Sequence, residues 1–103
     1  MINPVYEAIF NYADRIGERD IRDTKGPWVH RVNDEWEIAI NPHKHAFVAM
    51  PQYGANGAYM HPMHCAVWRN KKYVADVSPF DCFHVDLAFD RDEFIGMLNG
   101  VLF

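Results

Sequence analysis

The sequence predicts an α+β fold: an antiparallel sheet of about four to six strands, with an N-terminal and a short C-terminal helix packed on one face. Helical apolar spacing occurs near the two ends of the chain, whereas the middle shows the period of two that is typical of strands. Helices that are separated from a block of hairpins in this way favour the α+β class. The 103 residues, half of them apolar, are enough for one domain over residues 1–103 and too few for two.

The first predicted element is a helix that begins after Asn3. Asparagine is a good N-cap, and Pro4 suits the first helical position, where a backbone N–H is not needed. Gly17 is a typical residue at a helix end. The charged stretch at 18–26 then predicts a solvated connector, with a helix that continues to Arg22 as the alternative. The apolar stripe of the helix consists of Val5, Ile9, Tyr12 and Ile16.

Residues 28–32 and 35–40 predict a first hairpin. Asn33 and Asp34 lie between the two strands and tolerate the positive φ of a tight turn. In the second strand, apolar residues alternate with Glu35, Glu37 and a small alanine, so one face is predicted to be buried. The residues predicted on this core face are Trp36, Ile38 and Ile40.

Residues 65–69 and 72–77 predict a second hairpin, with its turn at Asn70 and Lys71. Aromatic residues in opposite strands stabilise such a pair by roughly 0.2–1 kcal/mol. The predicted cross-strand pairs are Trp68 with Tyr73 and Val67 with Val74.

The remaining elements are less regular. Residues 46–50 predict a short strand, and residues 51–62 a turn-rich loop without regular structure, because glycines and prolines interrupt it. After the second hairpin, residues 82–89 predict a further strand. Asp90 and Glu93 then resemble a capping box that starts a short closing helix. The predicted apolar faces consist of Phe83, Val85, Leu87 and Phe89 in the strand, and of Phe94, Met97 and Leu98 in the helix.

The net charge of −4 argues against general nucleic-acid binding, which normally requires a strong basic excess. The acidic charge is concentrated, because residues 76–93 contain six carboxylates and Arg91 as the one basic residue. Cys65 and Cys82 form no Cys-x-x-Cys pair, and the N-terminal residues lack the pattern of a signal peptide. No stretch approaches the roughly 20 apolar residues of a membrane span. We therefore expect a cytoplasmic protein with reduced thiols that contacts neither nucleic acid directly nor a membrane.

Four of the six histidines lie within residues 41–65, which we call the histidine loop. They form two close pairs, His43 with His45 and His61 with His64. If the ends of the loop converge, the four imidazoles could hold zinc or nickel in a structural or catalytic site. Zinc sites built from four histidines are unusual, however, and no carboxylate close in sequence is available to orient a ligand. No cofactor is therefore favoured, and zinc is the alternative.

The sequence contains no established catalytic motif, so a non-enzymatic role is favoured. Neither a Gly-x-Ser-x-Gly nucleophile motif nor a phosphate-binding glycine loop is present. A thiol–imidazole pair from Cys65 or Cys82 with His64 or His84 is one alternative, although neighbours in a strand face opposite sides. The other is a divalent-ion or acid–base site formed by Asp86, Asp90, Asp92 and Glu93.

The run HCAVWRNKKYVADVSPFD and the later DEFIGML resemble parts of a group of short uncharacterised proteins from phages and other mobile elements. The upstream WEIAIN is similar to a further strand of that group. The resemblance covers about half of the chain and departs from it at Asp81 and Cys82, where the group has glycines. It implies a phage or mobile-element origin and no particular activity. The matching residues are Val67, Trp68, Asn70, Ala75, Ser78, Pro79, Phe80, Asp92, Phe94, Ile95 and Leu98.

These observations together predict a protein-binding module that acts through an acidic face and an aromatic loop. A carboxylate face complements a basic nucleic-acid-binding groove on another protein. We therefore expect an inhibitor of a host nucleic-acid-handling defence complex, similar to anti-CRISPR proteins in size and character by analogy alone. A homodimeric structural protein is a further alternative. The predicted contact residues are Asp81, Asp86 and Asp92 on the acidic face, and Tyr53, Tyr59 and Met60 in the loop, which either face solvent or fold back on the core.

Overall fold

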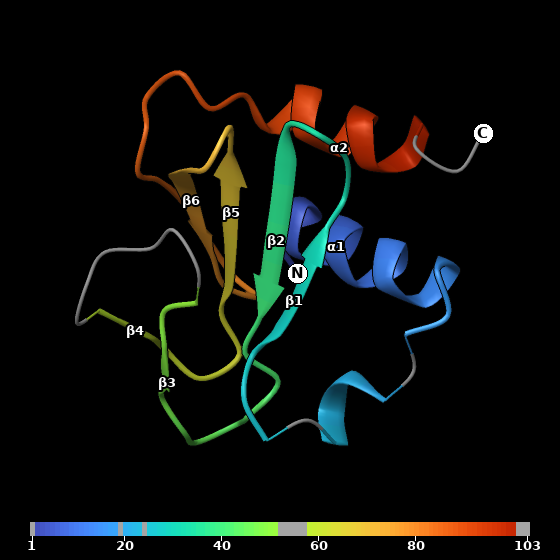
Figure 1. Ribbon diagram of the computed structural model, residues 1–103. Coiled ribbons are helices and arrows are strands. Elements are labelled where there is room, and N and C mark those ends of the chain that lie inside the picture. The colour runs from blue at the N-terminus through green and yellow to red at the C-terminus, as the bar shows by residue number, and fades with distance from the viewer. Residues whose placement is uncertain (1, 19, 24, 52–57, 101–103) are drawn as a thin grey trace.

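The computed structural model describes residues 2–18, 20–23, 25–51 and 58–100. It confirms the predicted α+β class: five antiparallel strands form one sheet in the order β1-β2-β5-β6-β7, and β3 pairs with β4 in a separate two-stranded sheet (Figure 1). The elements are α1 (Pro4–Arg15), the 3₁₀ helix η1 (Ile21–Asp23), β1 (Trp28–Arg31), β2 (Trp36–Ile40), β3 (Val48–Ala49), β4 (Tyr59–Met60), β5 (Cys65–Arg69), β6 (Lys72–Val77), β7 (Cys82–His84) and α2 (Arg91–Gly100).

Helix α1 begins and ends as the sequence predicted. The Asn3 side chain accepts hydrogen bonds from the backbone N–H groups of Val5 and Tyr6 at 2.8 and 3.4 Å. Gly17 follows the helix with φ +88°, a conformation that favours glycine. Because α1 ends at Arg15, the alternative of a continuous helix through the connector is wrong. The connector is also less solvated than predicted, since Ile21 is buried in the core.

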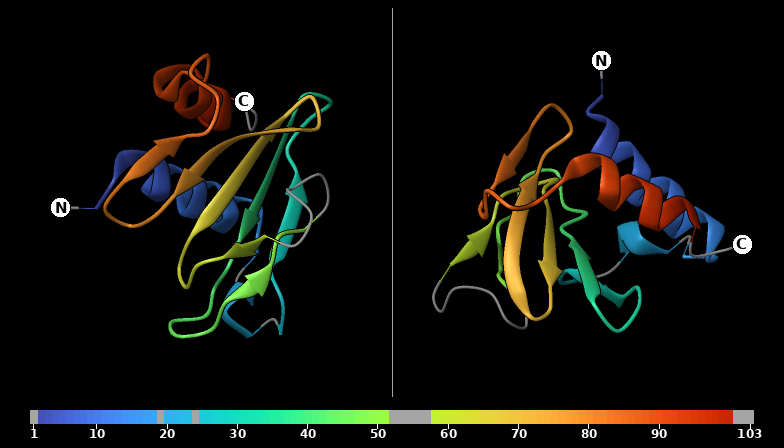
Figure 2. Two further views of the ribbon diagram at one scale, coloured as in Figure 1. Left: turned by 90° about the vertical axis from the view of Figure 1, so that its left-hand side faces the viewer. Right: turned by 90° about the horizontal axis from the view of Figure 1, so that it is seen from above.

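The main core lies between the sheet and the two helices, which cover the same face of the sheet (Figure 2). Helices α1 and α2 also contact each other. Trp36 is surrounded by aromatic rings: its ring centroid lies 6.1 Å from that of Phe89 and 5.2 Å from that of Phe94. The three residues predicted on the core face of β2 are all buried there.

The opposite face of the sheet carries a second, smaller core that the sequence did not predict. All five residues of β2 are buried, and on the face opposite the helices β3 and β4 cover Ala39. Residues 51–62 therefore do contain regular structure, contrary to the prediction, in the form of β4. This second core consists of Ala39, Met60, Ala66 and Trp68, with Val29, Val48, Met50 and Tyr73 packed at its edge.

The two predicted hairpins form, with one correction in each. The first turn does not use positive φ; instead, the Asn33 side chain accepts hydrogen bonds from the N–H groups of Glu35 and Trp36, both at 2.8 Å. In the second hairpin, Trp68 lies opposite Tyr73 as predicted. A register shift next to Trp68 places Val67 opposite Ala75 rather than Val74.

The predicted strand over residues 82–89 is too long, because β7 ends at His84. The backbone N–H groups of Val85 and Asp86 both donate to the Val74 carbonyl oxygen, at 3.0 and 3.1 Å. The Asp86 side chain then accepts from the Ala88 N–H at 2.9 Å, which closes a turn. The chain therefore leaves the sheet before the apolar alternation is complete.

Candidate functional site

The two ends of the histidine loop come together around the side chain of Asn41, which is fully buried. Its Nδ2 donates to the carbonyl oxygens of Ala46, Met60 and His61 at 2.9, 3.2 and 2.9 Å. Its Oδ1 accepts from the His43 N–H at 3.1 Å. The convergence of the loop ends thus depends on one buried amide, which the sequence reasoning did not single out.

The four clustered histidines do not meet at one point. His43 Nε2 lies 3.1 Å from the Lys25 carbonyl oxygen, whereas the rings of His61 and His64 lie 5.2 Å apart. Within the described residues, no three His, Cys, Asp or Glu side chains are placed to hold one metal ion. The structure thus brings two of the four histidines together and does not group them with His43 or His45.

His64 has a carboxylate partner that sequence spacing did not reveal. Its Nδ1 lies 3.1 Å from Oδ1 of Asp76 on the neighbouring strand β6. The register of the second hairpin is the signal that could have found this pair, since it places Asp76 opposite Ala66, two residues beyond His64. The pair orients the imidazole and anchors this end of the histidine loop.

The two thiols lie in surroundings that keep them protonated. Cys65 is fully buried, and burial raises the pKa of its thiol far above the ordinary value. Burial also raises the pKa of Cys82 to about 11. A nucleophilic cysteine needs a lowered pKa, so neither environment matches the proposed thiol–imidazole pairs.

The strongest surface feature is the segment over residues 80–92, which we call the apolar–acidic segment and which includes the orange loop leading to α2 in Figure 1. Of the five large apolar side chains within this segment, Phe89 is buried, whereas the other four are exposed to solvent. The predicted apolar face of residues 82–89 is therefore wrong as a core face. The exposed side chains are Phe80 at 81%, Phe83 at 66%, Val85 at 44% and Leu87 at 93%.

Local hydrogen bonds hold this segment in place. The Ser78 hydroxyl oxygen accepts from the N–H groups of Phe80 and Asp81, at 3.3 and 3.0 Å. At the other end, Asp90 Oδ1 accepts from the N–H groups of Asp92 and Glu93, at 2.9 and 3.1 Å. Asp90 thus caps α2 as predicted. The apolar side chains are exposed on a segment whose backbone is fixed.

The carboxylates of the segment, and Glu93 directly after it, differ in whether a basic side chain pairs with them. Asp86 pairs with Lys72 at 2.8 Å, and this hydrogen bond holds the pKa of Asp86 below its ordinary value. Glu93 pairs with Arg69 at 2.8 Å rather than completing the predicted capping box. Asp81 and Asp92 are exposed and take part in none of the ion pairs that the structure describes. They carry negative charge that no described ion pair neutralises, and Arg91 is the one basic residue of the segment.

The three predicted contact residues of the loop separate into three cases. Tyr59 is exposed, at 61%. Met60 folds back into the second core and is 2% exposed, so its side chain is not part of the surface. Tyr53 lies outside the described residues. The exposed aromatic ring of Phe47, which the sequence reasoning missed, packs against His61 near Tyr59's strand, with 4.9 Å between ring centroids.

Comparisons with known proteins add no relative. No family model, no curated protein and no solved structure matches this chain. The resemblance to short phage proteins therefore stays an expectation. None of the described helices has the length and apolar character needed to cross a membrane.

Proposed function

We propose that this chain is a non-enzymatic protein-binding module whose contact surface is the apolar–acidic segment. The observation that carries the proposal is the exposure of Phe80, Phe83, Val85 and Leu87 within eight consecutive residues. Single exposed apolar residues need no explanation, but a contiguous group of large ones is typical of an interaction site. Aromatic side chains are also enriched where proteins contact each other.

Charge supports a partner with a basic surface. In the sequence, Asp81 lies between Phe80 and Phe83 and Asp92 follows Leu87, and neither aspartate belongs to an ion pair among the described residues. An acidic surface with an apolar centre complements a groove that binds nucleic acid through Lys and Arg. The partner class we propose is therefore a nucleic-acid-handling protein, whose groove the segment occupies.

The biological form of the proposal is an inhibitor, encoded by a phage or mobile element, of a host nucleic-acid-handling defence complex. Two arguments support it. The chain is small and lacks an established catalytic motif, and part of it resembles short mobile-element proteins. A competitor for a basic groove needs only shape and negative charge, both of which the segment offers.

Affinity capture from candidate host lysates tests the proposal, with identification of the captured proteins by mass spectrometry. The purified partner should bind the wild-type chain in competition with nucleic acid. The double variant Phe83→Ser/Leu87→Ser should abolish this binding. The matched control is Phe47→Ser, because Phe47 is similarly exposed, at 57%, on another part of the surface. Equal binding by wild type and double variant would overturn the proposal.

A second pair of variants isolates the charge. Asp81→Lys/Asp92→Lys should weaken partner binding and reduce its dependence on salt, whereas Asp23→Lys/Asp34→Lys changes the net charge equally at exposed sites elsewhere. Light scattering tests the homodimer alternative. A dimer that dissociates in Phe83→Ser/Leu87→Ser would assign the segment to a second copy of this chain and contradict the proposed partner class.

A further inference from the structure

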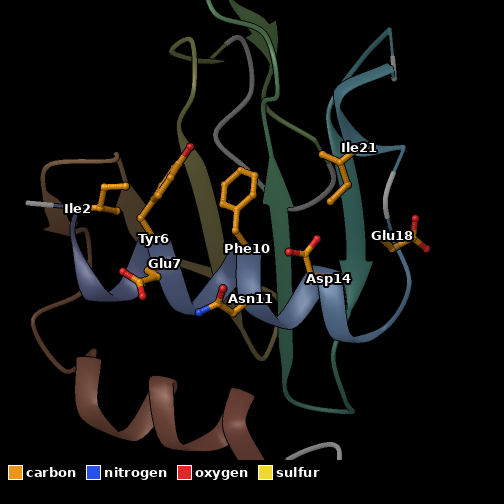
Figure 3. A pocket seen from close by; sticks show the side chains of 8 residues that line it. All are labelled: Ile2, Tyr6, Glu7, Phe10, Asn11, Asp14, Glu18 and Ile21. Carbon is orange, nitrogen blue, oxygen red and sulfur yellow. The ribbon is translucent and has the colours of Figure 1, made fainter.

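A groove with a volume of about 400 Å³ follows the outer side of α1 (Figure 3). Helix α1 has 12 residues, so at about 1.5 Å per residue it is about 18 Å long. The lining residues lie along this whole length and past its C-terminal end. They are Ile2, Tyr6, Glu7, Phe10, Asn11, Asp14, Glu18 and Ile21.

The groove combines an apolar floor with acidic edges. The rings of Tyr6 and Phe10 lie 4.7 Å apart at 38°, and Ile2 and Ile21 extend the apolar surface at the two ends. The described lining residues include three carboxylates, on successive parts of the helix and just beyond it, and no basic side chain. The carboxylates are Glu7, Asp14 and Glu18.

These carboxylates are not compensated by neighbours that the structure describes. None of the three belongs to an ion pair among the described residues. The one basic residue of α1, Arg15, points elsewhere, because its guanidinium donates to the Leu98 carbonyl oxygen at 3.3 Å. The described carboxylates of the groove therefore lie beside the half-buried rings of Tyr6 and Phe10, a combination that attracts Arg and Lys side chains.

We propose that this groove binds a basic, partly apolar peptide segment of a protein partner. The shape supports a peptide, since the lining residues extend along the helix instead of enclosing one compact space. Arg or Lys side chains of the segment pair with Glu7, Asp14 and Glu18, and an apolar side chain lies against the rings of Tyr6 and Phe10. The assignment is independent of the apolar–acidic segment, because none of the described lining residues of the groove belongs to that segment.

A titration followed by NMR tests this inference with a defined probe. The probe is a capped peptide of about 12 residues, enough to span the groove, that carries arginine and leucine in a Gly/Ser background. Shift changes should be confined to the groove residues. Replacing each arginine by citrulline, a neutral isostere, removes the positive charges of the peptide. Because each exposed ion pair contributes only a little, the loss of all of them together should weaken binding by about tenfold.

Matched protein variants make the test specific. Glu7→Gln/Asp14→Asn/Glu18→Gln should weaken peptide binding by about tenfold. Asp34→Asn/Asp81→Asn/Asp92→Asn removes the same charge elsewhere and should leave it unchanged, even if it weakens the partner proposed above. Preserved dispersion of the NMR spectrum shows that each variant is folded. Equal binding of the citrulline peptide, or equal binding by the groove variant, would overturn the inference. Tighter binding of spermidine than of the peptide would assign the groove to a small polyamine and overturn it as well.

Discussion

The histidine loop and the apolar–acidic segment both connect strands or helices at the surface, but they differ in how hydrogen bonds hold them and in which side chains they expose. The described part of the histidine loop is rich in polar groups, and it is held from within by the buried amide of Asn41. The apolar–acidic segment is held by hydrogen bonds at its surface, and it leaves four large apolar side chains in solvent.

This difference shows that residue type alone is a poor guide to which side chains are exposed at the surface. The histidines and tyrosines of the loop predicted a binding site there. The alternation of residues 82–89 predicted instead that the apolar residues of the segment form one face of a strand. In the structure, Met60 of the loop is buried and Leu87 of the segment is almost fully exposed. The two regions differ in their hydrogen-bond partners and in whether their apolar side chains reach the core.

The largest expected effect is that of Asn41→Ala. The substitution removes four hydrogen bonds to backbone groups, of which the bond to Met60 is buried. The free energy of unfolding should fall by about 2–3 kcal/mol, because a buried carbonyl loses its partner. Urea denaturation measures it, with Asn99→Ala at an exposed site as the control. A loss below about 0.5 kcal/mol would show that the loop does not depend on this amide.

The next effect is that of Asp90→Ala, at the junction of the apolar–acidic segment and α2. Loss of an N-cap typically destabilises a protein by about 1 kcal/mol. Asp92→Ala removes the same charge from the same helical turn without removing a described side-chain hydrogen bond, so it should destabilise the protein less. If both variants lose equal stability, Asp90 stabilises the helix only through its charge. Its two hydrogen bonds would then add nothing to the stability of this end of the segment.

Much of the fold could be predicted because its signals are local. Asn3, Gly17 and the turn at Asn70 and Lys71 act on neighbouring residues, and each has the conformation or hydrogen bond expected of it. The failures involve contacts that sequence spacing does not encode. Asn41 bonds to groups up to 20 residues away, and the burial of Met60 depends on the pairing of β3 with β4.

The candidate site was predicted only in part, for a related reason. Alternation indicates that a strand has two different faces, but it does not say that both are covered or where the strand stops. Asp86 ends the strand by forming a turn, so the residues that follow β7 lose the sheet that would have buried them. The acidic residues could be found from composition, whereas the exposed apolar group could be recognised only in the structure.

A smaller expected effect is the pH dependence of stability. It distinguishes the two regions because Asp86 forms an ion pair, whereas Asn41 forms only uncharged hydrogen bonds. The pKa of Asp86 is lowered in the folded chain, chiefly by Lys72, so its stabilising contribution is present above the ordinary carboxyl pKa of about 3.9. That contribution is lost as the pH falls through the lower, folded-state pKa. The stability difference between wild type and Asp86→Asn should therefore shrink from pH 7 to pH 3, as measured by urea denaturation. The effect of Asn41→Ala at the same two pH values should stay constant, because its hydrogen bonds carry no charge.

The smallest expected effect on stability is also the most decisive for the comparison. Phe83→Ser/Leu87→Ser replaces two large apolar side chains that are 66% and 93% exposed. If these residues contribute no core contacts, the free energy of unfolding should stay within about 0.5 kcal/mol of wild type. Replacement of a large buried side chain would cost more, about 3–5 kcal/mol as expected for Phe94→Ala in the core. A large loss of unfolding free energy in the double variant would mean that Phe83 and Leu87 pack against the rest of the chain. Unchanged stability would show that nothing in the isolated fold requires these two side chains, which is what the proposed contact role predicts.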